Sequence, residues 1–319
     1  MRIGIDIMGG DYAPLETTKG VIAALAEVPS SVRMVLFGDK QAICDIFTRE
    51  NADVSRVDII HTTEIIGMDE HPAKAITQKP DSSISRGFEF LKKKEIDAFA
   101  SAGNSGAMMV GAMFSVKTIP GILRPAISSV LPKEDGGWGV FLDVGANADC
   151  KPEVLQQFAV LGSVFLENVY GIPNPKVGLM NIGEEEEKGN ALSQATNQLL
   201  RNSKEVNFIG NIEGRDLFNN KADVIVCDGF TGNVILKMAE SFYGLIKRRD
   251  IHDAYFDRFN YENYGGTPVL GVNAPVIIAH GISQQLAIKN MIHSAIKVTE
   301  AGLSEKISGA LQSTLTTQA

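Results

Sequence analysis

The sequence contains few cysteines, one tryptophan and no long hydrophobic run, and these shortages exclude several classes of protein. Cys44, Cys150 and Cys227 are far apart in a chain of 319 residues, which argues against a disulfide framework or a cysteine-rich metal site. The apolar runs fall well short of the roughly 20 residues that a membrane-spanning helix needs. No signal peptide is readable at the first residues. We therefore expect a cytoplasmic protein that folds without metals or disulfides.

Positive charge is also scarce, because 38 Asp and Glu residues outnumber 30 Lys and Arg residues and give a formal net charge of −8. Such a balance argues against a broad nucleic-acid surface, since binding to that polyanion depends on neutralising its phosphates. Two basic clusters, at residues 92–94 and 247–249, are expected to be solvated helix ends. An anionic partner would have to bind at a local patch.

Short apolar runs alternate with helix-length amphipathic segments along the whole chain, which predicts a mostly parallel α/β sheet covered on both faces. No linker or repeat divides the sequence, so residues 1–319 are expected to form a single α/β domain, with a helical excursion at 240–268. The expected helices include residues 15–27, 83–94, 104–116, 153–169, 190–201, 231–248 and 284–300. The expected strands are Ile3–Ile5, Met34–Phe37, Val57–Ile60, Ala98–Ala100, Ile127–Leu131, Val140–Leu142, Val177–Met180, Asn207–Ile209, Val224–Val226 and Pro275–Ile278.

Glycine-rich turns follow many of these strands, at the edge where parallel α/β proteins bind ligands. One such turn offers small residues whose backbone N–H groups and hydroxyls could hold an anion such as phosphate. The alternative is that Asn104 or Ser105 simply caps the next helix. The candidate binding residues of this turn are Ser101, Gly103, Asn104, Ser105 and Gly106.

A second turn of this kind adds a carboxylate and an amide, and helix capping is again the alternative. Neither turn matches the dinucleotide-binding fingerprint or the Walker A lysine pattern, which argues against hydride transfer and nucleotide hydrolysis. The candidate residues of this second turn are Asp228, Gly229, Thr231, Gly232 and Asn233.

Three other segments contribute candidates at the same edge. Gly9 and Gly10 precede Asp11, which could orient a polar substrate or cap a helix, and Asn147 and Asn190 follow two further strands. A lysine and a histidine near this edge are the most informative further candidates. Lys188 could neutralise a phosphate or be an ordinary surface lysine.

His280 ends an expected strand and could donate a proton to a phosphate or to a leaving thiolate. The sequence contains no G-x-S-x-G nucleophile elbow, and the three cysteines are expected to be structural. We therefore expect the site to bind an external nucleophile rather than to supply one.

Taken in order, the segments carrying these candidates closely resemble the bacterial PlsX phosphate acyltransferases, over nearly the whole chain. The resemblance implies a homodimeric three-layer α/β/α fold akin to isocitrate dehydrogenase and phosphotransacetylase. It also implies transfer of a fatty acyl group from acyl carrier protein to inorganic phosphate, for phospholipid synthesis. The segments are DIMGGDYAP at residues 6–14, SAGNSGA at 101–107, DVGAN at 143–147, KGN at 188–190, DGFTGN at 228–233, NYGG at 263–266, APVI at 274–277 and AHG at 279–281.

The family resemblance further implies that Lys188 and Asn233 occupy active-site positions. We expect phosphate to attack the thioester carbonyl directly, without a metal or cofactor. In this scheme Lys188 binds phosphate or the carrier's phosphopantetheine phosphate, Asn233 polarises the carbonyl, and His280 donates a proton or binds phosphate.

Two departures from the family pattern qualify these expectations. Tyr12 stands where the family usually has histidine, and the segment between Lys247 and Asn263 is shorter than in many members. Longer versions of this segment contribute to dimer contacts and peripheral membrane association. Here its aromatic residues, Tyr255, Phe256 and Phe259, could form a small membrane-facing patch or pack within the core or a dimer.

Two rival functions remain open at this point. One is a phosphotransacetylase acting on short acyl-coenzyme A, which would use the same sheet edge. The other is a membrane-peripheral scaffold without catalysis.

Overall fold

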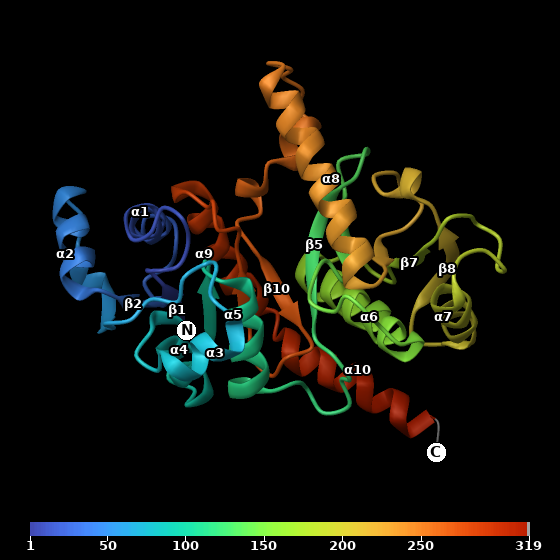
Figure 1. Ribbon diagram of the computed structural model, residues 1–319, viewed down its shortest axis with the longest axis horizontal. Coiled ribbons are helices and arrows are strands. Elements are labelled where there is room, and N and C mark those ends of the chain that lie inside the picture. The colour runs from blue at the N-terminus through green and yellow to red at the C-terminus, as the bar shows by residue number, and fades with distance from the viewer. Residues whose placement is uncertain (318–319) are drawn as a thin grey trace. The chain divides into compact units, whose positions relative to one another are not determined.

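The computed structural model describes residues 1–317, and the chain divides into two compact units. Unit 1 contains Met1–Thr118 and Tyr261–Glu300, and unit 2 contains Ile119–Asn260 and the chain from Ala301 onward. Unit 1 is therefore discontinuous in sequence. Figure 1 labels the elements of both units.

Unit 1 is built on a sheet whose strands lie in the order β3-β2-β1-β4-β11-β10. All neighbours in this sheet are parallel except β10 and β11, which pair in opposite directions. The strands are β1 (Arg2–Asp6), β2 (Arg33–Gly38), β3 (Val57–His61), β4 (Ala98–Ser101), β10 (Thr267–Leu270) and β11 (Val276–Ile278).

Helices cover both faces of this sheet, with α1 and α9 on one side of its strands and α4 and α5 on the other (Figure 1). Phe99 of β4 faces α4, where its ring lies 5.1 Å from that of Phe88 and where Gly87 leaves room for it. On the other face, Gly20 of α1 lets that helix pack closely on Ile288 of α9. The helices are α1 (Leu15–Leu25), α2 (Lys40–Arg49), α3 (Pro72–Gln78), α4 (Ser83–Lys92), α5 (Ser105–Gly111), continued by a π-helical turn η2 (Ala112–Val116), and α9 (Gln285–Glu300), with short 3₁₀ turns η1 (Val54–Arg56) and η6 (Tyr261–Asn263).

Unit 2 has its own sheet, in the order β5-β6-β9-β7-β8. Only the β5–β6 pair is antiparallel. The strands are β5 (Ala126–Pro132), β6 (Trp138–Leu142), β7 (Lys176–Met180), β8 (Asn207–Ile212) and β9 (Val224–Val226).

Successive side chains of β6 point to opposite faces of this sheet, as strand geometry requires. Val140 and Leu142 approach Gly162 of α6, whereas Phe141 belongs to a buried cluster that Ile235 of α8 contacts. Unit 2 is therefore also layered as helix, sheet and helix. Its helices are α6 (Pro152–Phe165), continued by a π-helical turn η3 (Leu166–Tyr170), α7 (Ala191–Asn202), α8 (Gly229–Arg248) and α10 (Leu303–Thr317), with short 3₁₀ turns η4 (Gly214–Asp216) and η5 (Phe256–Phe259).

The prediction of a mostly parallel α/β fold is confirmed, and each of the ten expected strands is present to within a residue or two at its ends, except that β8 continues to Ile212. The structure adds β10, which lies at the end of the region expected to be helical. It also adds α2, α3 and α10 to the expected helices. The expectation of one domain stays a prediction.

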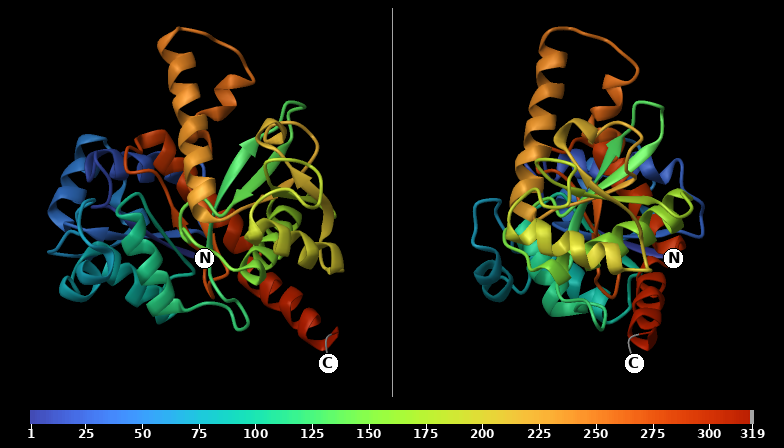
Figure 2. Two further views of the ribbon diagram at one scale, coloured as in Figure 1. Left: turned by 45° about the vertical axis from the view of Figure 1, so that its right-hand side comes forward. Right: turned by 90° about the vertical axis from the view of Figure 1, so that its right-hand side faces the viewer.

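The helical excursion begins with α8, which extends well beyond the strands of its own unit (Figures 1 and 2). After Arg248 the chain turns back, and the ring of Tyr255 packs on that of Phe259, which in turn packs on Phe218 of the same unit. Packing within the unit is thus the arrangement adopted by two of the three aromatic residues, while Phe256 is more exposed. No helix within residues 1–317 combines the length and apolarity needed to cross a membrane.

Arg258 connects the segment after α8, residues 253–260, to the β5–β6 hairpin. Its guanidinium lies 4.2 Å from the ring centre of Trp138 and donates hydrogen bonds to the carbonyl oxygens of Lys133 (2.9 Å) and Gly137 (2.6 Å). Tyr255 adds a hydrogen bond from its hydroxyl to the carbonyl oxygen of Pro132. These contacts hold residues 253–260 against the sheet of their own unit.

Replacing Arg258 by alanine should release residues 253–260 from this hairpin, because the replacement removes two charge-assisted hydrogen bonds and a cation–π contact. We expect faster amide hydrogen exchange in these residues and a changed emission from Trp138, the only tryptophan in the sequence. The exposed Arg248→Ala variant is the matched control and should change neither signal. Unchanged exchange in Arg258→Ala would contradict this account.

Candidate active site

The glycine-rich turns of unit 1 follow β1, β4 and β11, which are adjacent parallel strands. Their carboxyl ends therefore meet at one edge of the sheet. The structure brings the candidates at residues 9–11, 101–106 and 280 together at this edge.

A buried aspartate, Asp6, organises two of these turns. Its carboxylate accepts hydrogen bonds from the Ser101 hydroxyl (2.6 Å) and from the backbone N–H of Met8 (3.0 Å), and the Ser101 hydroxyl in turn accepts one from the Gly103 N–H (2.8 Å). Burial raises the pKa of Asp6 above its ordinary value, against the opposing effect of these hydrogen bonds. Asp6 is not among the site residues predicted from the sequence, although its place at the end of a strand, three residues before a double glycine, is a signal for such a role.

Gly9 and Gly10 are glycines for reasons of space and backbone conformation. A Cβ at Gly9 would lie 2.7 Å from the backbone nitrogen of Gly103, so any side chain would push the two turns apart. Gly10 has φ = +108°, a region that residues with a Cβ rarely adopt. Both glycines therefore shape the edge, which leaves backbone N–H groups as their possible contribution to binding.

The side chain of Asn104 is fully used within the protein. Its oxygen caps α5 by accepting from the Ala107 N–H (2.9 Å), and its nitrogen donates to the carbonyl oxygens of Gly67 (3.0 Å), Met68 (3.3 Å) and Glu70 (3.0 Å). The capping alternative thus describes this side chain. In the same turn Ser105 is exposed, and Gly106 packs closely against Pro72.

The loop after β11 lies against the first turn. The Asp11 N–H donates to the carbonyl oxygen of Gly281 (2.8 Å), which places the exposed Asp11 beside the loop that carries His280. The ring of His280 is partly buried and stacks edge-on with Tyr261 at 5.0 Å.

The turns of unit 2 follow β6, β9 and β7, which are again adjacent and parallel. A second buried aspartate, Asp143, directly follows β6. Its carboxylate accepts from the N–H groups of Ile127 (3.0 Å), Ala146 (3.2 Å) and Asn147 (2.6 Å), and burial raises its pKa. Each unit therefore has a buried carboxylate that fixes a turn at the edge of its sheet.

Several predicted binding residues of unit 2 are occupied by structural hydrogen bonds. The Asn147 amide donates to Asp143 (2.9 Å) and to the carbonyl oxygen of Pro125 (2.8 Å). Asp228 caps α8 through the N–H (2.8 Å) and hydroxyl (2.9 Å) of Thr231. Asn190 similarly caps α7 by a reciprocal pair of hydrogen bonds with Ser193.

Gly229 and Gly232 are required by close packing. A Cβ at Gly229 would lie 2.7 Å from the Asn147 carbonyl oxygen, and one at Gly232 would lie 1.9 Å from that of Asp143. The first turn of α8 is thus pressed directly against the turn after β6.

Lys188 and Asn233 present exposed polar side chains. The neighbouring acidic residues are neutralised by other cations, since Glu184 pairs with Lys221 (2.7 Å) and Glu186 with Arg201 (2.9 Å), so the Lys188 ammonium lies outside these ion pairs.

Asn233 is held in place because its amide nitrogen donates to the carbonyl oxygen of Val144 (3.1 Å). This bond uses one of its two amide hydrogens. A lysine that can neutralise an anion and an amide that can polarise a carbonyl are therefore available in this unit.

The cysteines of this region are poor nucleophiles. Burial raises the pKa of the Cys150 thiol to about 11 and that of the Cys227 thiol well above its ordinary value. Both therefore carry their proton at neutral pH, when only a thiolate attacks readily. This agrees with structural roles for these residues.

Comparison with known proteins identifies the family. A family profile described as "Fatty acid synthesis protein" matches residues 1–251 and 245–306. A phosphate acyltransferase of Dictyoglomus turgidum is 43% identical over 327 residues, covering 96% of each chain. One from Thermoanaerobacterium thermosaccharolyticum is 44% identical over 94% of this chain and 93% of its own. The chain belongs to this family. It is an acyltransferase, and the predicted membership of the PlsX family is confirmed.

Solved structures show how widely the fold of this acyltransferase is used. EutD phosphotransacetylase from Staphylococcus aureus superposes with a TM-score of 0.64 over 94% of both chains, at 17% identity. A branched-chain phosphotransacylase from Enterococcus faecalis gives the same TM-score at 12% identity, over 94% of this chain and 99% of its own. At such identities the likeness establishes the fold, in agreement with the phosphotransacetylase-like architecture that was expected.

The buried Asp6 gives the acyltransferase a defined dependence of stability on pH. Because its pKa is raised in the folded state, its contribution to the free energy of unfolding is fully present below the ordinary carboxyl pKa of about 3.9 and is lost as the pH rises through the raised value. Wild type should therefore gain stability relative to Asp6→Asn as the pH falls from neutral. Urea unfolding across this range measures the difference.

Asp53→Asn is a control of opposite sign. Hydrogen bonds from Ser55 lower the pKa of Asp53, so wild type should lose stability relative to this variant on acidification. Parallel pH profiles for wild type and Asp6→Asn would contradict the assignment of a raised pKa to Asp6.

Proposed function

We propose that the enzyme transfers a fatty acyl group from acyl carrier protein to inorganic phosphate by direct attack of phosphate on the thioester. A phosphate oxygen forms a bond to the carbonyl carbon, the carbon–sulfur bond breaks, and the thiolate leaves to take up a proton. The products are an acyl phosphate and free carrier protein, in the cytoplasm. Membership of the phosphate acyltransferase family, together with the exposed Lys188 and Asn233 on turns of unit 2, carries the proposal.

Each side chain has a separate role in this scheme. Lys188 binds phosphate or the phosphate of the carrier's prosthetic group as a mobile positive charge. Asn233 donates its second amide hydrogen to the oxygen that becomes negative as phosphate attacks. His280, on unit 1, binds phosphate or protonates the leaving thiolate. The edge turns with Gly9, Gly10 and Ser105 on unit 1 supply backbone and hydroxyl donors, and Asn104 holds the turn of Ser105 in shape. On unit 2 the turns are held in shape by Asn147, Asn190, Asp228 and Thr231.

Removing either side chain of unit 2 should impair the reaction strongly. We expect Lys188→Ala and Asn233→Ala each to lower kcat/KM for acyl phosphate formation by roughly 100-fold or more, the usual effect of losing a donor to a developing oxyanion or a phosphate contact. Lys204→Ala, an exposed lysine before β8, is the control and should be fully active. Near-normal activity in both test variants would refute these roles.

The same assay separates direct transfer from its alternatives. Long-chain acyl carrier protein is incubated with and without phosphate, and free thiol and acyl phosphate are followed together. Thiol release without phosphate would indicate a thioesterase. Equal activity on short acyl-coenzyme A without the carrier would indicate the phosphotransacetylase alternative.

We further propose that the enzyme is a homodimer formed through α8. Large apolar side chains recur every three or four residues along this helix, which places them on one face, and each is at least 47% exposed. A continuous exposed stripe on a long helix is typical of a surface that packs against a second copy. Its members are Phe230, Val234, Met238, Phe242 and Leu245.

A charge in the middle of this stripe should disrupt the dimer. We expect Phe242→Asp to weaken self-association by at least about tenfold, since burying an unpaired carboxylate is costly. Light scattering after gel filtration measures the mass. Phe114→Asp, which alters an even more exposed phenylalanine of η2 in unit 1, is the control.

Monomeric wild type that sediments with anionic lipid vesicles, and loses this property in Phe242→Asp, would assign the stripe to peripheral membrane contact instead.

A further inference from the structure

Three loops of unit 1 meet at Gly281. The Asp11 N–H donates to the Gly281 carbonyl oxygen (2.8 Å), which joins the turn after β1 to the loop after β11. The third loop, between β3 and α3, brings the methyl group of Met68 so close that a Cβ on Gly281 would lie 2.6 Å from it. Met68 therefore lies against the loop that follows β11, at the edge that carries the candidate binding turns.

Each of these loops also exposes a large apolar side chain. Tyr12 follows Asp11, Ile282 follows Gly281, and Met68 lies on the third loop, and all three are between 46% and 51% exposed. The next exposed apolar residues, Leu15 and Leu286, lie near the starts of α1 and α9, which a hydrogen bond from the Gln285 N–H to Glu16 joins (3.1 Å). We call Tyr12, Met68 and Ile282 the apolar rim. Exposed residues of this kind are ordinary when scattered, but here they border one edge.

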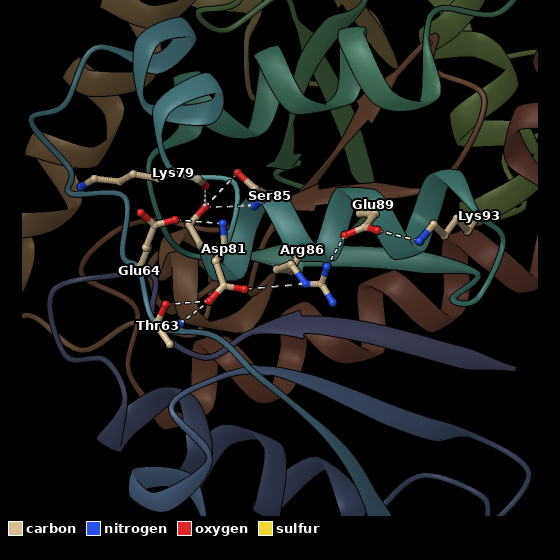
Figure 3. A network of polar contacts seen from close by, with 9 residues as sticks. Thr63, Glu64, Lys79, Asp81, Ser85, Arg86, Glu89 and Lys93 are labelled. Atoms are coloured by element: carbon tan, nitrogen blue, oxygen red, sulfur yellow. Dashed lines mark hydrogen bonds and ion pairs between the residues drawn. The ribbon is translucent and has the colours of Figure 1, made fainter.

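The loop carrying Met68 is held in place from both ends. On one side, Asp81 accepts hydrogen bonds from the N–H (3.0 Å) and hydroxyl (2.7 Å) of Thr63, and its own N–H donates to Glu64 (2.9 Å), as Figure 3 shows. On the other, Glu70 accepts from the Gly67 N–H (2.7 Å) and pairs with Lys79.

Between these two sets of contacts, the amide nitrogen of Asn104 donates hydrogen bonds to the carbonyl oxygens of Gly67, Met68 and Glu70. Met68 is thus presented on an ordered loop, so contact with a ligand requires little further ordering of the backbone.

Asn104 joins the apolar rim to the polar turn after β4, because its backbone belongs to that turn and its side chain holds the loop of Met68. A ligand at this edge of unit 1 therefore meets polar backbone groups and, next to them, an apolar surface. A fatty acyl thioester has this combination of a polar reacting group and an unbranched alkyl chain. Methionine suits such a chain, since its flexible thioether adapts to varied apolar shapes.

We infer that the apolar rim binds the alkyl chain of the acyl substrate and that Met68 determines the preference for chain length. This inference rests on the proposed acyl transfer and specifies the substrate contact made by unit 1. Each methylene that lies on the rim is removed from water, so long chains gain from the contact and short chains do not.

The test compares two acyl lengths on the same carrier protein, so that carrier docking cancels. Acyl phosphate formation is measured with butanoyl- and hexadecanoyl-acyl carrier protein for wild type, Met68→Ser, Met68→Leu and Met113→Ser. Met113 is the matched control because it has nearly the same exposure, 48%, but lies on η2.

We expect Met68→Ser to lower kcat/KM for the hexadecanoyl substrate by about tenfold and to change the butanoyl value by less than about twofold, an effect of the size seen when a hydrophobic contact is lost. Met68→Leu should restore the wild-type ratio, and Met113→Ser should keep it.

An unchanged ratio of the two kcat/KM values in an active Met68→Ser enzyme would overturn the inference while leaving the proposed function intact. An equal loss for both chain lengths would also overturn it, because Met68 would then only support the turn. If Met68→Ser altered dimer mass or vesicle binding without altering the ratio, the rim would belong to an interface with protein or lipid. Failure of wild type to form acyl phosphate would overturn the proposed function and the inference with it.

Discussion

The edge turns of both units depend on a buried carboxylate that is surrounded by backbone N–H groups and short polar side chains. Asp6 ends a strand and Asp143 directly follows one, and each can remain in the interior only because backbone N–H groups and short polar side chains hydrogen-bond to it. The same bonds offset part of the cost of burying the carboxylate and also fix the backbone of the turn that follows. Rigid N–H groups and amides at a strand edge are useful for acyl transfer, because a preorganised donor stabilises a developing oxyanion without first reorienting.

The distinction between residues that hold the turns and residues that remain exposed follows from this constraint. Asn104, Asn147, Asp228 and Asn190 have the residue types of ligand-binding groups, but the protein uses their side chains itself. Lys188 and Asn233 remain accessible at the ends of the same motifs. A motif of this kind therefore contains both side chains that hold a turn in shape and side chains that remain exposed.

The strands of the fold can be predicted from the sequence better than the roles of the residues in the turns. Apolar runs bounded by glycine marked ten strands, since buried parallel strands are continuous hydrophobic segments. They did not reveal β10, which contains Pro268 and lies beside a polar, aromatic-rich region, nor the antiparallel direction of the β5–β6 pair, which no apolar run encodes. Likewise, the sequence alone does not distinguish an aspartate or asparagine that caps a helix from one that binds a ligand. Only the hydrogen-bond partners of Asp228 and Asn104 in the folded structure distinguish the two roles.

Because unit 1 is discontinuous in sequence, its sheet can be completed only late in the synthesis of the chain. The strand β11 lies between β4 and β10 in the sheet of unit 1, yet residues 276–278 follow the whole of the 142-residue segment Ile119–Asn260 in sequence. A nascent chain that has exposed only its first 118 residues therefore has β4 as an open sheet edge, with hydrogen-bonding groups that await a strand made much later. All five strands of unit 2 precede residue 227, so its sheet can form during this interval, and the two sheets are completed in the reverse of the order in which they begin.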